Sequence, residues 1–204
     1  AGSTCTVLVE FVPAVVGSFA ETLTVNYNDG LIAQTTARPM TGNAVNPANL
    51  TLSDASPYDF GNVGTGTTVT KTFTMTNSGG FAASLVVDGA TLGAPFDYLG
   101  GGGYPGGVGT CGITLAALAS CTIEIEYSPL AVNADASVLT VNYNDGTGAT
   151  NVTKNVQGNA ISPAVIAILG ADPADFGTVP VGSNNSMIIA IQNTGGFNAT
   201  VMSG

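Results

Sequence analysis

Hydrophobic and polar residues alternate along several stretches of the chain. Between positions 120 and 127, for example, Cys121, Ile123, Ile125 and Tyr127 alternate with polar residues. This period of two places the apolar side chains on one face of an extended strand, and helical spacing is sustained nowhere. The alternation and the turn residues between the stretches predict strands near residues 50–53, 58–63, 67–77, 81–88, 120–127, 136–143 and 149–157.

The alternation gives each strand one buried and one solvated face, which is typical of antiparallel sheets. Asn144-Asp145-Gly146 follows the strand at 136–143 and is a strong turn signal, because these residues tolerate a positive φ. Seven such strands predict an all-β fold, a sandwich of two antiparallel sheets.

Two cations interrupt the predicted core faces. Lys71 and Lys154 lie at positions that the alternation turns inward. An unpaired buried ammonium group is costly. We therefore expect each lysine to lie at a sheet edge or to reach the rim of the sandwich on its long stem.

A long internal repeat organises the chain. The eight residues at 23–30 return unchanged at 139–146, a shift of 116 positions. Shorter motifs, among them Asp-Phe-Gly at 59–61, return with the same shift. No insertion or deletion interrupts the match between residues 1–88 and 117–204. Such a repeat predicts tandem structural units.

The repeat divides the chain into one complete and two partial units. The complete unit covers residues 49–163. Residues 1–48 correspond to the C-terminal part of a preceding unit, and residues 164–204 to the N-terminal part of a following unit. Each partial unit leaves a hydrophobic face and strand edges open, and open edges recruit partners.

Two arrangements can satisfy these partial units. The chain is either an excerpt of a longer covalent array of repeats, or one subunit's carboxyl end and the next subunit's amino end complete a sandwich by strand addition. The second arrangement lacks a counterpart of residues 89–116, which counts against it. Both predict a linear, head-to-tail assembly of copies or adjacent repeats.

Composition narrows the range of partners. Only 8% of the 204 residues are charged, the formal net charge is −10, and the three cations lie far apart. Phosphate binding needs clustered Lys and Arg, so we expect no nucleic-acid partner. The apolar runs are much shorter than the ~18 residues that span a bilayer, so we expect no membrane insertion.

The first residues resemble no leader, so we expect any signal peptide to be removed or to lie outside the sequence.

The chain contains no histidine. This excludes the Ser-His-Asp and Cys-His catalytic pairs and every imidazole metal ligand. We assign no catalytic residue and predict that the chain is not an enzyme. Asp29 and Asp145 lie in Asn-Asp-Gly turns, and the turns account for them, so we assign no metal site and no cofactor.

A glycine-rich stretch at residues 99–109 is the candidate interaction loop. It lacks the Gly-Lys-Ser or strand-to-helix context of a phosphate-binding loop. Two interpretations stay open: a plain flexible connection, or a mobile loop that contacts a glycan or a protein. In the second interpretation Tyr104 lies at the tip, flanked by Gly103 and Pro105.

Several motifs together carry a family resemblance. They are Asp59-Phe60-Gly61-Asn62-Val63 with Gly66, Asn77-Ser78-Gly79, Cys111 with Cys121, Tyr127-Ser128-Pro129 and Gly158-Asn159-Ala160. This arrangement resembles the bacterial choice-of-anchor D repeats, part of the wider group that includes the ASPM, SPD-2 and Hydin domain. The resemblance implies tandem immunoglobulin-like antiparallel β-sandwiches in secreted or surface-anchored proteins. It implies no single activity.

The resemblance also implies a disulfide between Cys111 and Cys121, against the alternative of two free buried thiols. A disulfide would place the chain in an oxidising compartment. Cys5 corresponds to Cys121 in the repeat. We expect its partner to lie outside the sequence or in a neighbouring subunit.

Tandem sandwiches joined by a short, proline-containing linker predict a semi-rigid rod. We therefore predict a non-enzymatic extracellular structural protein, a stalk or surface filament at the bacterial cell surface. The alternative is a surface adhesin that recognises a glycan or a protein through its loop tips.

Overall fold

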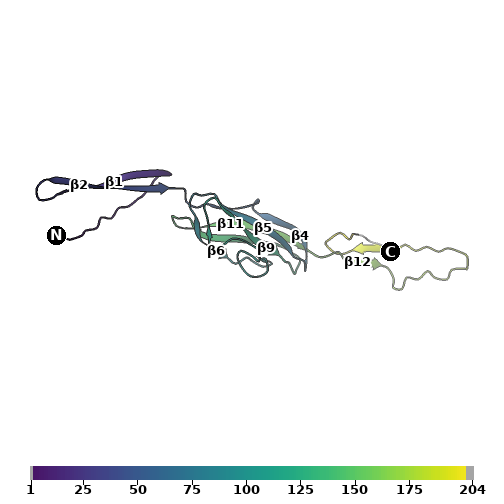
Figure 1. Cartoon of the computed structure of the whole chain (residues 1–204). Coiled ribbons are helices and arrows are strands. Elements are labelled where there is room, and N and C mark those ends of the chain that lie inside the picture. Colours follow the sequence, from purple (N-terminus) through teal and green to yellow (C-terminus); the bar gives the residue numbers. More distant parts are fainter. Residues whose placement is uncertain (1, 201–204) are drawn as a thin grey trace.

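The computed structural model describes residues 2–200. These residues form the strands β1–β13 and contain no helix. A hairpin, a β-sandwich and a short strand pair follow one another along an extended molecule, with the hairpin and the strand pair at opposite ends (Figure 1). The prediction of an all-β fold is confirmed.

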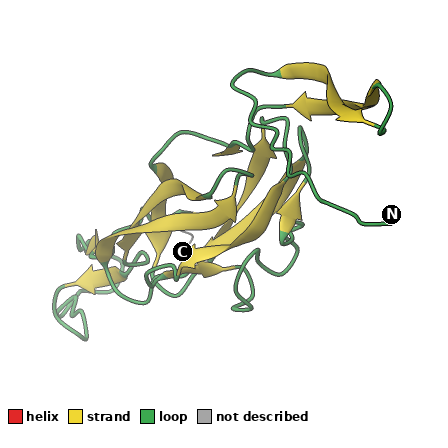
Figure 2. Ribbon diagram, turned by 90° about the vertical axis from the view of Figure 1, so that its left-hand side faces the viewer, coloured by secondary structure: helices red, strands yellow, loops and turns green. Residues whose placement is uncertain are grey.

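The N-terminal hairpin consists of β1 (Gly17–Asn28) and β2 (Ala33–Ala44), and it stands apart from the sandwich (Figure 2). Its turn is closed by Asp29, whose carboxylate accepts hydrogen bonds from the backbone N–H groups of Leu31 and Ile32. Within the described residues no second sheet packs on the hairpin. As a result Val25 and Tyr27 are 42% and 50% exposed.

The central sandwich contains two sheets. One has the strand order β4-β11-β10-β6-β8 and the other the order β3-β5-β9-β7. All pairs are antiparallel except β4 with β11. The strand bounds are β3 (Leu50–Leu52), β4 (Tyr58–Gly64), β5 (Val69–Asn77), β6 (Ala83–Ala90), β7 (Phe96–Tyr98), β8 (Thr114–Leu115), β9 (Ser120–Tyr127), β10 (Asn133–Asn144) and β11 (Ala149–Ile161).

The seven predicted strands are all present, and β7 and β8 are additional. Each of the two extra strands is an edge strand of two or three residues. So short a segment carries less than two full alternations of polar and apolar residues, which explains why the pattern did not predict them. The chain is an immunoglobulin-like antiparallel sandwich with a mixed edge at β4.

The core lies between the two sheets. Phe73 and Met75 on β5 face Leu139 and Val141 on β10, and all four side chains are fully buried. Tyr127 on β9 is also fully buried, stacked on Phe96 at 4.6 Å between ring centroids. These inward positions are the ones that the alternation selects.

The two lysines meet at one loop between β3 and β4. Lys71 forms an ion pair of 2.8 Å with the Asp54 carboxylate and remains partly exposed at the rim. Lys154 is only 4% exposed and lies in β11, a central strand and not a sheet edge. Its stem carries the ammonium group to the backbone carbonyls of Asp54 and Ala55. This agrees with the expectation that the lysine reaches the rim of the sandwich on its long stem.

The C-terminal pair consists of β12 (Ile166–Leu169) and β13 (Ala190–Asn193). Most of its apolar side chains are exposed, because no further strand or sheet packs on it within the described residues. Phe176, the counterpart of Phe60, is 50% exposed. Phe176 therefore fills no core within the described chain.

Candidate functional site

Cys111 and Cys121 form a disulfide, as the family resemblance implied. Both residues are buried, and the bond ties the end of the glycine-rich stretch to β9. The backbone N–H of Thr110 adds a hydrogen bond of 3.0 Å to the Thr122 carbonyl. Cys5 carries an exposed free thiol.

The glycine-rich loop at 99–109 lies along β9. The backbone N–H of Leu99 donates to the Glu124 carbonyl, and the N–H of Glu124 donates to the Pro105 carbonyl. These bonds, of 3.0 and 2.8 Å, join one residue of β9 to two loop residues that lie six positions apart. The backbone of the loop is therefore tied to β9 at Leu99 and Pro105, and the two interpretations of the loop stay predictions.

Tyr104 is not at an exposed tip, which corrects that part of the sequence-based interpretation. Its ring packs edge-on against Tyr98 at 5.9 Å, and its hydroxyl is buried without a hydrogen-bond partner among the described residues. Burial raises the pKa of the Tyr104 hydroxyl to about 12, with a smaller contribution from the charge of Asp88. Gly103 beside it is exposed and has a φ of 78°. A ligand-binding role for Tyr104, Gly103 and Pro105 stays a prediction.

Asp145 closes the turn between β10 and β11. One of its carboxylate oxygens accepts hydrogen bonds from the backbone N–H groups of Thr147 and Gly148. These bonds favour the charged form and lower the pKa of the Asp145 carboxyl. Asp29 closes the equivalent turn in the N-terminal hairpin and its pKa is lowered for the same reason.

The strand pairings at the two ends of the molecule repeat those of the complete unit. In the hairpin Gly17 pairs with Ala44, and 116 positions later Asn133 pairs with Ala160. Throughout the two hairpins every pair keeps this correspondence. In the C-terminal pair, β12 and β13 likewise have the register of β3 and β5. Each end therefore has the backbone arrangement of one strand pair of the complete unit, and we call each end a half-sandwich.

The N-terminal segment 4–11 is the counterpart of β9 but forms no strand. Val7 and Phe11 are 62% and 52% exposed, whereas their counterparts Ile123 and Tyr127 are fully buried. The difference arises because no strand like β5 lies beside residues 4–11 in the described chain. The segment has the side chains of a central strand without its neighbours.

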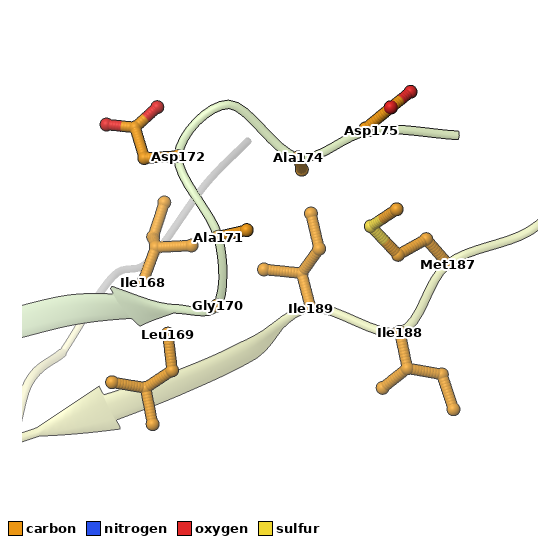
Figure 3. A pocket seen from close by; sticks show the side chains of 10 residues that line it. All are labelled: Ile168, Leu169, Gly170, Ala171, Asp172, Ala174, Asp175, Met187, Ile188 and Ile189. Carbon is orange, nitrogen blue, oxygen red and sulfur yellow. The ribbon is translucent and has the colours of Figure 1, made fainter. Parts of the chain in front are cut away.

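The C-terminal half-sandwich contains an apolar cavity of about 480 Å³ (Figure 3). Ile168, Met187 and Ile189 point into it from the two sides. Asp172 and Asp175 border it and direct their carboxylates away from these apolar side chains. Ile189 is 49% exposed, whereas its counterpart Phe73 is fully buried, so the cavity is an open core face.

Neither protein-family models nor curated proteins match the chain. Several solved structures match parts of the chain. The VesB protease of Vibrio cholerae is 20% identical with a TM-score of 0.44, and the match covers 54% of this chain and 31% of that one. The PapD-like domain 7 of human CEP192 is 14% identical with a TM-score of 0.38, covering 62% and 93%. The resemblance to choice-of-anchor D repeats stays a prediction.

The prediction that the chain is not an enzyme is contradicted by these comparisons. Besides VesB, the secreted serine protease VesC of Vibrio cholerae is 23% identical with a TM-score of 0.37. That match covers 54% of this chain and 23% of VesC. The chain thus spans less than a third of either protease, and the likeness concerns the fold of that part alone.

Proposed function

We propose that the chain is an extracellular structural module whose immunoglobulin-like units follow one another head to tail in a rod, stalk or surface filament. The observation that carries this proposal is the repeated strand register at both ends of the molecule. Each end repeats one strand pair of the complete unit and exposes side chains whose counterparts the complete unit buries. Units of this kind become stable when neighbours cover those faces.

The disulfide and the family resemblance support a role outside the cell. The Cys111–Cys121 disulfide suits an oxidising compartment. No helix among residues 2–200 is long and apolar enough to cross a membrane. The similarity to choice-of-anchor D repeats points in the same direction, because those repeats occur in secreted or surface-anchored bacterial proteins.

Electron microscopy of the native material tests the proposal. We expect extended rods or filaments whose axial repeat matches one sandwich plus its linker. The mass of the denatured chain, measured on the same sample, separates a long covalent array from an assembly of short subunits. Compact isolated particles would contradict the proposal.

The adhesin hypothesis is tested separately through the loop at 99–109. A glycan array is probed with the chain and with a Tyr104→Ala variant. Saturable binding that the substitution abolishes would favour an adhesin over a spacer.

A further inference from the structure

The two half-sandwiches are complementary in their strands. The N-terminal segment and hairpin supply counterparts of β9, β10 and β11, and the C-terminal segment supplies counterparts of β3, β4 and β5. In the complete unit β5 and β9 are neighbours, as are β4 and β11. The strands β7 and β8 have no counterpart in either segment and lie at sheet edges, and β6, which lies beside β8, corresponds mostly to residues outside the described chain. A joint sandwich therefore does not need them to connect its halves.

One pair of positions points to a direct contact between the two halves. On the outer face of the complete unit Thr72 lies opposite Glu124, and the hydroxyl donates a hydrogen bond of 3.2 Å to the carboxylate. The counterparts of these residues are Ile188 and Leu8. Both counterparts are apolar, whereas Thr72 and Glu124 are polar. Ile188 is 98% exposed and Leu8 is 87% exposed. Opposed apolar side chains stabilise a strand pair, whereas each alone would be an exposed hydrophobic residue.

We propose that residues 4–11 of one copy form a strand antiparallel to residues 185–192 of a second copy. The register is that of β9 on β5, so Val7 lies opposite Ile189 and Cys5 lies opposite Ile191. This pairing names the partner in the head-to-tail assembly and rests on the function proposed above. Main-chain hydrogen bonds hold the added strand, and alternate side chains fill the open core.

The hairpin of the first copy closes the apolar cavity of the second copy. In the complete unit Lys154 on β11 donates to the carbonyls of Asp54 and Ala55. The corresponding residues are Arg38 on the hairpin and Gly170 and Ala171 at the cavity. Arg38 thereby brings a cation to a cavity bordered by the acidic residues Asp172 and Asp175. The charges at the border of the cavity therefore favour the hairpin that carries Arg38 as its occupant.

The contact forms between molecules. The hairpin with residues 4–11 and the strand pair with residues 185–192 lie at opposite ends of the extended chain (Figure 1). The sandwich between them keeps them apart. Each copy consequently has one end that donates a strand, residues 4–11, and one end that accepts it, residues 185–192. Such a heterologous contact builds open chains of subunits.

A cysteine placed opposite Cys5 tests the register. In an Ile191→Cys variant, mild oxidation of the purified 204-residue chain is expected to give a ladder of covalent dimers and longer oligomers on a non-reducing gel. Peptide mapping is expected to find a disulfide that joins Cys5 to the introduced thiol. The matched control is Ile188→Cys, whose side chain points to the other face of the same strand. An equal ladder in the control, or a ladder that survives Cys5→Ser, would overturn the proposal.

A charge at the open core tests the contact without cross-linking. Ile189→Asp is expected to raise the concentration for half-association at least ~10-fold in sedimentation experiments, because the carboxylate would be buried without a partner. Leu130→Asp is the control, since Leu130 is an apolar residue of the central unit that is more exposed than Ile189, 88% against 49%. Thermal unfolding of the central sandwich reports that both variants remain folded. A wild-type chain that stays monomeric up to high concentration would refute the pairing.

The outcomes separate this inference from the proposed function. Rods in which Cys5 never cross-links to the thiol introduced by Ile191→Cys would overturn the strand exchange and leave the rod in place. Cross-linked closed rings or dimers, seen by electron microscopy, would support the strand exchange and overturn the rod.

Discussion

The ammonium group of Lys154 donates a hydrogen bond to the backbone carbonyl of Asp54, a residue 100 positions earlier in the chain. The same aspartate binds Lys71 through its carboxylate at 2.8 Å. The two lysines therefore hold the β3–β4 loop against β11 and β5, from both sheets of the sandwich. Only the Lys154 contact is closed to solvent, since that residue is 4% exposed.

We expect Lys154→Met to destabilise the central sandwich. The substitution leaves the carbonyls of Asp54 and Ala55 without their charged donor, and losing hydrogen bonds to a charged group costs about 1.5–3 kcal/mol. Urea denaturation measures the loss. The control is Lys71→Met, which removes a partly exposed ion pair worth less than ~1 kcal/mol. Equal losses in the two variants would contradict the prediction.

How far the sequence predicts the fold depends on the length of each alternating stretch. The strand β9 has the predicted bounds, because Cys121, Ile123, Ile125 and Tyr127 all face a core that buries them almost completely. The edge strands β7 and β8 are too short to show a period. Their partners also lie far along the chain, as Phe96 pairs with Tyr127.

The candidate sites also differ in how far the sequence predicts them. The half-sandwiches are visible in the sequence because the repeat reports them directly. The inward position of Tyr104 is not visible, because it depends on tertiary contacts. The backbone bond between Glu124 and Pro105 and the packing against Tyr98 hold the ring in place, and neither leaves a local pattern.

Alkaline pH is expected to destabilise the chain through Tyr104. Burial raises its pKa to about 12 in the folded protein, above the value of about 10 for an exposed tyrosine. The unfolded chain therefore loses this proton first as pH rises. The stabilising contribution is complete below pH ~10 and disappears between pH ~10 and ~12.

Denaturant titrations across this pH range measure the effect. A Tyr104→Phe variant keeps the ring and lacks the ionisable group, so its stability should fall less steeply. Tyr98 and Tyr127 also have raised pKa values, through burial and bonds to Asp88 and Asp135, and they provide the remaining slope. Parallel curves for wild type and variant would show that Tyr104 ionises freely.

Removal of the disulfide is expected to lower stability by about 2–3 kcal/mol, the usual contribution of a bond that closes a short loop. The Cys111→Ser, Cys121→Ser double variant is compared with wild type by thermal unfolding. The loss should appear in the glycine-rich loop first, because Cys111 lies two residues after that loop. Hydrogen exchange at Thr110 and Thr122 reports this local opening. Cys5→Ser serves as the control, since the Cys5 thiol is exposed and free.

Two equivalent glycines distinguish the complete sandwich from the open one. A Cβ atom on Gly79 would lie 2.0 Å from the Pro47 carbonyl oxygen, and one on Gly195 would lie 1.9 Å from that of Pro163. Neither contact is tolerable, so each substitution must move the linker that precedes its unit.

The consequences of Gly79→Ala and Gly195→Ala nevertheless differ. The Pro47 linker leads into Ala48, which is buried in the core cluster, so Gly79→Ala should cost at least about 2 kcal/mol of sandwich stability. The Pro163 linker leads into an exposed half-sandwich, so Gly195→Ala should leave the unfolding of the isolated sandwich unchanged. If the half-sandwich is completed by a second copy, Gly195→Ala should instead weaken association. Unfolding experiments on the two variants measure what this clash costs the stability of the sandwich. Sedimentation experiments on the same variants measure what it costs the association of two copies.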